Sequence, residues 1–387
     1  MALKVPFKKF DPDFNEFIQV CEGLKDPDRV HHVEVIVDEE IKKEIVEKHL
    51  GQKFHPPVGM FFGEADKSLK SLKKEDHIKA KEDYYRMNIS FHYHMGYSFV
   101  TDHDFLIDLE GFNTVSEKTN DTAALSRGER FWAQEGQGLI RTWDDYEDFP
   151  WNKAEGLLEE YDTHLDFVGK NLPDGMKIAV VGAVNAQLLG WMLGFEGLFY
   201  LIQDDFKLVK TVFDRMGEII SKMYQIAASK DKVGILWHGD DLGFKTSTML
   251  SPDTLRELHF PWYRKYSKIA HSNGKKFWVH NCGYKDNIME DLIEDIGMDA
   301  LHSFEDTCCS IIDYKKKYGD RIALLGGVDI DKLASLEEED LRKYVREILK
   351  VCMDGGRFAL GSGNSITNFT PVENYLIMMD EGNKWFL

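Results

Sequence analysis

Six short apolar runs punctuate the chain from residue 177 onward, and longer amphipathic stretches separate them. Several of the runs end in a glycine or a polar cluster, and their length and composition predict buried strands. The predicted strands lie at residues 177–182, 233–239, 275–279, 300–304, 321–326 and 357–361.

The stretches between these runs carry apolar residues at helical spacing. They predict helices at residues 186–195, 206–229, 252–273, 285–296, 310–318 and 336–353. Strands that alternate with helices indicate βαβ units and a parallel sheet.

The N-terminal half is less regular but adds one or two strands, at residues 33–37 and 90–100. A total of about eight units favours a closed (β/α)₈ TIM barrel with an N-terminal extension. We expect a helical extension over residues 1–90, packed on a barrel over 91–387, with an insertion at about 112–170.

Aromatic residues gather between residues 131 and 151 of this insertion. They either line a pocket or form a hydrophobic seam that joins the extension to the barrel. We also expect His92, His94 and His103 to border the barrel mouth.

The composition narrows the classes of function. Lys and Arg number 48 against 67 Asp and Glu, a formal charge of −19, and hydrophobic residues make up 43%. The apolar share excludes wholesale disorder. The acidity argues against nucleic-acid binding, which needs clustered cations.

The cysteine pattern and the search for targeting segments indicate the cellular compartment that we expect. Five scattered cysteines do not form a disulfide pattern. We see neither a signal-peptide core near the start nor an apolar run near the roughly 18 residues of a membrane span. We therefore expect a cytoplasmic protein with reduced thiols.

Polar residues follow the predicted strands at their carboxyl ends, where (β/α)₈ enzymes place their chemistry. They are Asn185, Asp240, Asp241, His280, Cys282, Glu305, Asp329, Ser362 and Asn364, and His302 lies inside the predicted strand at 300–304.

His280 and Cys282 form the sharpest pair, because two residues at i and i+2 past a strand can face one point. Imidazole and thiolate together suit zinc. His302, Glu305 and Cys309 follow one unit later and offer further ligands, and Asp240 and Asp241 are further candidates for an oxygen donor. Packing of a buried His and Cys at the barrel mouth is the alternative.

The other candidates have two readings each. Asp240 and Asp241 are an acid–base pair or substrate clamp, or else a helix cap or loop ion pair. His302 is a ligand or base, or a hydrogen-bonded core residue. Residues 361–364 form an anion cradle or a tight turn. Arg141 binds a carboxylate or makes a structural ion pair.

Several motifs resemble the uroporphyrinogen decarboxylase superfamily. They are MLSP at 249–252, FPWY at 260–263, LGGVD at 325–329, GSGN at 361–364 and TPVEN at 370–374. The resemblance implies a (β/α)₈ barrel and, by analogy only, a homodimer.

True decarboxylases of this family hold an acidic tetrapyrrole with an Arg-rich N-terminal motif, an Asp, a Tyr, the Ser of the LSP motif and a late His. This chain keeps Ser251, lacks an Arg-rich motif near its start and has Ser362 at the position of the late His. The resemblance therefore leaves decarboxylation as the alternative function.

A second branch, the corrinoid-linked methyltransferases of anaerobes, binds zinc through His-x-Cys and a later Cys. His280 and Cys282 match the first half, whereas Ser362 replaces the later Cys. Glu305 or His302 stands near a third ligand position. The resemblance implies a zinc-dependent methyltransferase that moves a methyl group between a small methylated donor or corrinoid protein and an acceptor.

Within this expectation, the catalytic candidates are Asp240, Asp241, Ser251 and His302, and the substrate-binding candidates are Arg141, Asn185, Asp329, Ser362 and Asn364. His280, Cys282 and Glu305 are the expected metal ligands. A non-catalytic barrel that binds a corrinoid protein is the second alternative.

Overall fold

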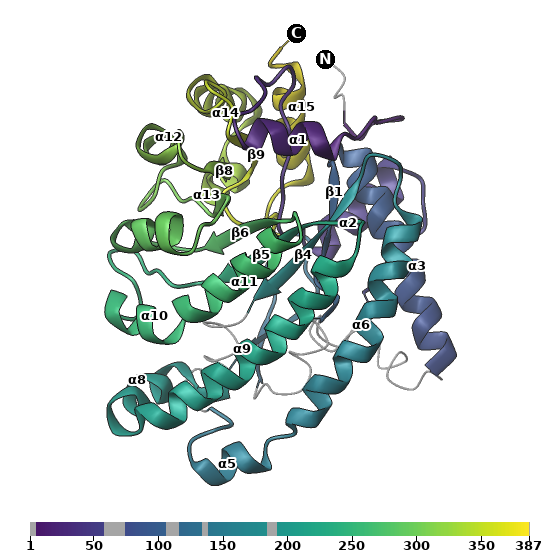
Figure 1. Cartoon of the computed structure of the whole chain (residues 1–387). Coiled ribbons are helices and arrows are strands. Elements are labelled where there is room, and N and C mark those ends of the chain that lie inside the picture. The colour runs from purple at the N-terminus through teal and green to yellow at the C-terminus, as the bar shows by residue number, and fades with distance from the viewer. Residues whose placement is uncertain (1–4, 58–73, 106–115, 134–137, 184–191, 387) are drawn as a thin grey trace.

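A curled parallel sheet of seven strands organises the chain (Figure 1). The structure is a computed structural model and describes residues 5–57, 74–105, 116–133, 138–183 and 192–386. Neighbouring strands follow the order of the chain. They are β1 (Phe99–Asp102), β4 (Lys177–Ala183), β5 (Val233–Asp240), β6 (Lys276–Asn281), β7 (Ala300–His302), β8 (Ala323–Val328) and β9 (Phe358–Ser362).

Helices cover the outer face of this sheet, and most of them connect its strands, as βαβ units require (Figure 1). They are α6 (Trp151–Asn171), α8 (Phe195–Asp204), α9 (Phe206–Ser229), α10 (Pro252–Leu258), α11 (Phe260–Ser272), α12 (Ile311–Tyr318), α13 (Ile330–Ser335), α14 (Glu338–Cys352) and α15 (Val372–Lys384). None of the described helices combines the length and apolar character that a membrane span requires.

The segment before α2 (Glu39–Glu44) extends the sheet beyond β9. His32 pairs with Leu360 and Val37 with Ile366, both in parallel. Within the described residues, no backbone pairing joins this segment to β1. The predicted strand at 33–37 is therefore present only as these two isolated bridges, while closure of the barrel stays a prediction.

Helix α1 (Phe14–Cys21) covers the amino ends of the strands. The Phe17 ring contacts the rings of Phe99 and Trp278, with centroids 5.7 and 5.8 Å away. Phe14 lies against Gly234 at the start of β5, where a Cβ would come within 2.3 Å of its ring. Because α1 covers the amino ends, the polar residues gather at the carboxyl ends of the strands.

The predicted strand at 90–100 is wrong, because α3 (Lys74–Met95) runs through most of it. Tyr84, Asn88, His92 and Met95 are buried at spacings of three and four, a helical period. The aromatic content of the segment concealed this period. A strand begins only at Phe99, after Gly96 leaves the helix with φ +87°.

Two predicted helices also differ from the structure. Residues 252–273 form two helices, α10 and α11, that meet at His259, just before Pro261. Residues 285–296 form a 3₁₀ turn (Asp286–Ile288) and a π-helical turn (Asp291–Asp295). The predicted helix at 186–195 falls largely outside the described residues.

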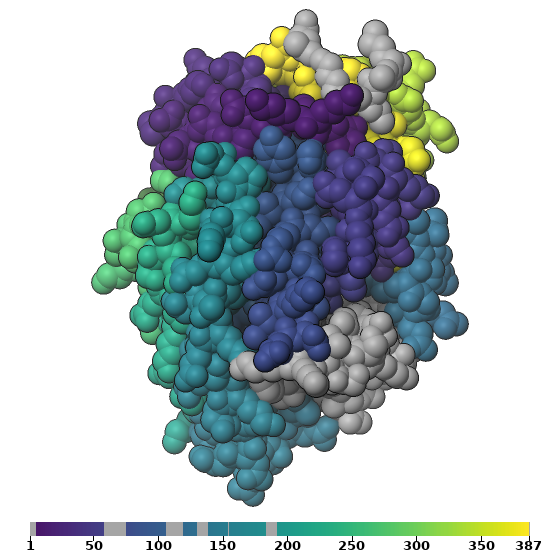
Figure 2. Space-filling view, turned by 90° about the vertical axis from the view of Figure 1, so that its right-hand side faces the viewer, coloured from purple at the N-terminus to yellow at the C-terminus, as the bar shows by residue number. Residues whose placement is uncertain are grey.

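The insertion contains an antiparallel hairpin of β2 (Ser116–Asn120) and β3 (Glu129–Ala133), with α5 (Trp143–Asp148) and α6 after it. On the surface, α3 and α6 lie side by side (Figure 2). The division of the chain at residue 90 stays a prediction.

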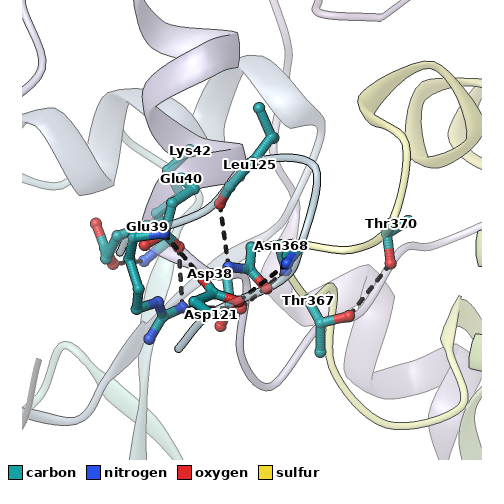
Figure 3. Close-up of polar contacts among 11 residues, drawn as sticks. Asp38, Glu39, Glu40, Lys42, Asp121, Leu125, Thr367, Asn368 and Thr370 are labelled. Atoms are coloured by element: carbon teal, nitrogen blue, oxygen red, sulfur yellow. Dashed lines mark hydrogen bonds and ion pairs between the residues drawn. The ribbon is translucent and has the colours of Figure 1, made fainter. Parts of the chain in front are cut away.

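Ion pairs and hydrogen bonds connect the turn of this hairpin to two segments that are distant in the sequence (Figure 3). Arg127 Nη2 lies 3.0 Å from Asp38 Oδ2 and 2.9 Å from Glu40 Oε2 at the start of α2. Asn368, between β9 and α15, donates through Nδ2 to Asp121 Oδ2 at 2.7 Å and to Leu125 O at 3.1 Å. These contacts fix where the insertion meets the sheet.

Candidate metal centre

Three potential metal ligands converge at the carboxyl ends of β5 and β6. His280 Nε2 lies 3.2 Å from Cys282 Sγ and 3.7 Å from Asp241 Oδ1. The ligand atoms of all three residues lie within 4.8 Å of one another. Gly239 of β5 pairs with His280 of β6, so strand register places Asp241 beside Cys282. One nitrogen, one sulfur and one oxygen donor form a set that suits zinc and leaves a fourth position open.

The hydrogen bonds of His302 define the tautomer of His280. His302 Nε2 lies 3.3 Å from the backbone oxygen of Ser362, which can only accept, so Nε2 carries the proton. Burial lowers the pKa of His302 well below its usual value, and a neutral ring then has an acceptor at Nδ1. His280 Nδ1, at 2.7 Å, must donate to it.

It follows that the lone pair of His280 lies on Nε2, the atom that faces Cys282 and Asp241. Burial also lowers the pKa of His280, which favours the neutral ring. Ligating histidines typically donate their second nitrogen in this way. The arrangement therefore prepares His280 for a cation without rearrangement.

Two polar groups point hydrogen atoms at the sulfur of Cys282. Asn364 Nδ2 donates to Sγ at 3.0 Å, and Ser303 Oγ donates at 3.6 Å. Burial, followed by the charge of Asp241, raises the pKa of the Cys282 thiol well above its usual value. A bound cation acts in the opposite direction and deprotonates a coordinating thiol.

Lys285 is a residue of this region that sequence reasoning missed. Its side chain is fully buried, and Nζ donates to the backbone oxygens of Gly283 and Ser303, both at 3.0 Å. It thereby ties the loop after β6 to the residue after β7. A lysine just past a polar strand end was the available signal.

Asp240 and Asp241 point to different environments. Asp240 is buried, accepts a hydrogen bond from Tyr263 of α11 and lies 3.3 Å from His238 Nε2. The side chain of Asp241 is 39% exposed and belongs to the metal-ligand group. The structure thus favours a positioning role for Asp240 and a ligand role for Asp241.

Glu305 lies outside the convergent group, which takes its oxygen donor from Asp241 instead. The residue forms a turn in which its backbone oxygen accepts from Cys309 N at 2.8 Å. The sulfur of Cys309 lies 3.4 Å from Lys285 Nζ. The geometry therefore favours Asp241 over Glu305 as the third ligand.

Two of the remaining candidates cap helices. Ser251 Oγ accepts from Thr254 N at 3.1 Å at the start of α10, and Asp329 Oδ1 accepts from Asp331 N at 3.0 Å at the start of α13. Arg141 is exposed and donates through Nε to Gly138 O. Asn185 lies outside the described residues.

The loop at 361–364 uses its backbone amides within the protein. Ser362 donates through N and Oγ to the two carboxylate oxygens of Glu34, at 2.7 and 2.6 Å. Gly363 N donates to Val328 O. This arrangement favours the tight turn over an anion cradle.

Glu34 is a second residue that the sequence did not reveal, because its partner is 328 positions away. Burial raises the pKa of Glu34 to about 8. Glu34 lies on the segment that extends the sheet beyond β9. Its hydrogen bonds connect this N-terminal segment to Ser362, the position where the resemblance places the later Cys ligand.

The predicted histidines near the mouth separate into two kinds. His92 and His94 hydrogen-bond through Nδ1 to Asn88 O and Phe7 O, so they support α3 and the N-terminal segment. His103 follows β1 at the carboxyl end of the sheet. Both of its ring nitrogens are buried and lack a hydrogen-bond partner among the described residues.

The described part of the aromatic segment forms a seam. The ring centroids of Phe149 and Trp151 lie 4.4 Å apart, and Trp143 Nε1 donates to Asp205 Oδ2 at 2.8 Å. These residues pack against the main core. The seam interpretation is therefore favoured for this part of the insertion.

A small apolar pocket opens beside Asp241. Its lining comes from α8, from the loop after β5 and from α10, and includes Phe195, Phe199, Leu242, Met249 and Leu250. Asp241 and His259 are the polar lining residues. Burial lowers the pKa of His259 to about 4, so its ring is neutral at pH 7.

Comparison with family models identifies a match over most of the described sheet. The profile of the family described as uroporphyrinogen decarboxylase (URO-D) matches residues 140–385, which include β4 to β9 and all three convergent ligands. No curated protein matches the chain.

Among solved structures, a methyltransferase from Methanosarcina mazei superposes with a TM-score of 0.63 at 14% identity. The match covers 97% of this chain and 100% of that one. A putative vitamin-B12-independent methionine synthase from Listeria monocytogenes gives a TM-score of 0.46 at 12% identity, over 91% and 94% of the two chains. At this identity the first likeness shows a shared fold, and the second carries no argument.

Proposed function

The chain belongs to the uroporphyrinogen decarboxylase family, and within that family we propose that it is a zinc-dependent methyltransferase with a small thiol as acceptor. The observation that carries the proposal is the convergence of His280 Nε2, Cys282 Sγ and an Asp241 carboxylate oxygen at one point. The fold that it shares with a Methanosarcina methyltransferase is consistent with this reading.

The side chains around the site fit a zinc ion. His280 presents a lone pair, Asn364 and Ser303 donate to the sulfur as a thiolate ligand requires, and Asp241 supplies an oxygen. When bound, zinc lowers the pKa of a coordinated thiol so that a thiolate exists at neutral pH.

The protein's own residues would hold the acceptor in place for transfer. A substrate thiol gives its proton to water, and its sulfur forms a bond to the methyl carbon. The bond between that carbon and the donor breaks, and its electron pair stays with the donor. We propose a corrinoid, free or protein-bound, as the donor.

Purified protein supplied with zinc, methylcobalamin and 2-mercaptoethanol tests the proposal. We expect loss of the methylcobalamin absorbance and formation of the methyl thioether, detected by mass spectrometry. Cys282→Ala should abolish product, whereas Cys352→Ala, which alters a buried thiol on α14, should not. A zinc-loaded protein that forms no thioether would overturn the proposal.

A further inference from the structure

The pocket beside Asp241 shares that residue with the candidate metal centre. Asp241 is both a member of the ligand group and part of the pocket lining. A thiol bound through its sulfur at the fourth position would therefore have this pocket next to it. Its volume of about 20 Å³ admits only a short part of the rest of the molecule.

The walls of the pocket are apolar. Phe195 and Phe199 of α8 face Met249 and Leu250 of the loop before α10, with Leu242 beside Asp241. Burial of an apolar chain against such walls contributes about 25 cal/mol for each Å² removed from water. A charged group would lose its hydration there.

One lining side chain lacks the partner that a buried polar group normally has. His259 is 2% exposed, and neither ring nitrogen has a hydrogen-bond partner among the described residues. Leaving a buried polar group unpaired is unfavourable by about 1–3 kcal/mol. A hydrogen-bonding group of a ligand that reaches one of these nitrogens would relieve this.

The charge of the pocket excludes one class of ligand. Among the lining residues that the structure describes, Asp241 alone carries a formal charge, and no Lys or Arg is present to neutralise an anionic group. The charges of Asp241 and of a Cys282 thiolate would cancel that of a bound Zn²⁺, so the protein itself supplies no net counter-charge for an ammonium group.

We propose that the acceptor thiol carries a neutral, mainly apolar tail with a single hydrogen-bonding group, and that this tail fills the pocket between α8 and His259. The assignment rests on the proposed function, because it takes the sulfur to be bound at the metal centre. It excludes thiols with a carboxylate, sulfonate or ammonium end as preferred acceptors.

Cobalt(II) in place of zinc gives a readout that does not depend on turnover, since a thiolate bound to Co²⁺ adds sulfur-to-metal charge-transfer absorption. The probes are thiols with chains of two to four carbons that end in hydroxyl, methyl, ammonium or carboxylate. We expect hydroxyl ends to bind about three- to tenfold more tightly than methyl ends. Charged ends should bind at least about tenfold more weakly than hydroxyl ends.

Two variants test the pocket itself. His259→Phe should remove the preference for hydroxyl over methyl ends, whereas the same change at the exposed His77 should not. Phe199→Lys should raise the affinity for carboxylate ends, because Phe199 is 44% exposed and a lysine there can keep its stem on the wall. Tyr200→Lys, at a 71% exposed neighbour outside the lining, is the control.

The outcomes separate the two proposals. If thiols bind the cobalt protein but charged and neutral ends bind equally, the tail assignment is overturned and the proposed function stands. If no added thiol increases the charge-transfer absorption beyond that of the Cys282 thiolate, the metal-centred function fails, and the tail assignment fails with it.

Discussion

His302 shows how one buried side chain can define the chemistry of its neighbour. It accepts from His280 and donates to Ser362, so its two nitrogens have opposite roles. When both rings are neutral, only one tautomer of each ring satisfies these two hydrogen bonds. At the scale of the residue, the candidate metal centre thus depends on a side chain that is not itself a ligand.

Replacement of His302 tests this positioning role. His302→Met removes both hydrogen bonds, and we expect zinc affinity to fall about 10- to 100-fold, as for other residues that support metal ligands. His302→Gln keeps one donor and one acceptor and should retain most of the affinity. Competition with a chromophoric chelator measures both variants. Equal affinities for Met and Gln would show that His302 only fills space.

Glu34 makes the stability of the protein depend on pH. Burial raises its pKa from 4.5 to about 8 in the folded chain. A carboxyl group whose pKa is higher in the folded state binds more protons in that state than in the unfolded chain. Its contribution to stability is therefore complete below about pH 4.5 and is lost as pH rises through 8.

We therefore expect Glu34→Gln to remove a pH-dependent part of the free energy of unfolding. Between pH 4.5 and 8, the difference between wild type and variant should change by at most about 1.4 kcal/mol per pH unit, to the disadvantage of the wild type. Urea unfolding at several pH values measures it. If the free energies of unfolding of the two proteins depend on pH in the same way, the raised pKa of the buried Glu34 is contradicted.

At the scale of elements, the segment at residues 30–37 is held against β9 by close backbone contact. Val33 N donates to Leu360 O, and Leu360 N donates to His31 O, both at 2.9 Å. Gly361 permits this approach, because a Cβ there would come within 1.8 Å of Val33 O. The same contact brings Glu34 to Ser362.

Gly361→Ala should therefore separate the segment from β9. We expect a loss of about 1–3 kcal/mol or more in the free energy of unfolding, together with faster hydrogen exchange of the Val33 and Leu360 amides. Gly156→Ala on α6, where nothing lies within 4 Å, should be neutral or stabilising. A Gly361→Ala variant as stable as wild type would disprove the contact.

The strands after residue 177 were predictable because each is a short apolar run bounded by polar residues. All six appear within a few residues of their predicted bounds. The segment at 90–100 failed because aromatic residues suit either a strand or a buried helix face. The hydrogen bonds between Glu34 and Ser362 could not be predicted, since no local pattern in the sequence links residues so far apart.

The pair of His280 and Cys282 was predictable from spacing, but its third partner was not. Glu305 and Asp241 are both acids just past a strand, and sequence alone does not rank them. Register between β5 and β6 brings Asp241 to the pair. Pairing of strands, rather than the composition of either strand, decides which acid is available.

At the scale of the whole molecule, the net charge of −19 bears on which family activity the chain performs. Uroporphyrinogen carries eight carboxylates, and a strongly acidic protein repels such a polyanion at long range. Among the described residues, those that converge at the carboxyl ends of β5 and β6 are potential metal donors.

We therefore expect no decarboxylation of uroporphyrinogen. Incubation at high protein concentration under anaerobic conditions should leave the substrate unchanged, as judged by chromatography of the oxidised porphyrins. A bona fide uroporphyrinogen decarboxylase in the same assay is the control. Appearance of coproporphyrin above the enzyme-free background would return the chain to the decarboxylase branch.

The most direct test of the account is X-ray absorption at the zinc edge of protein supplied with zinc. We predict one ion per chain with a single sulfur at about 2.3 Å and nitrogen or oxygen at about 2.0–2.1 Å. Cys282→Ser should lose the sulfur, and Cys352→Ser should keep it. A protein that takes up no zinc, or zinc without a sulfur neighbour, would contradict the metal centre.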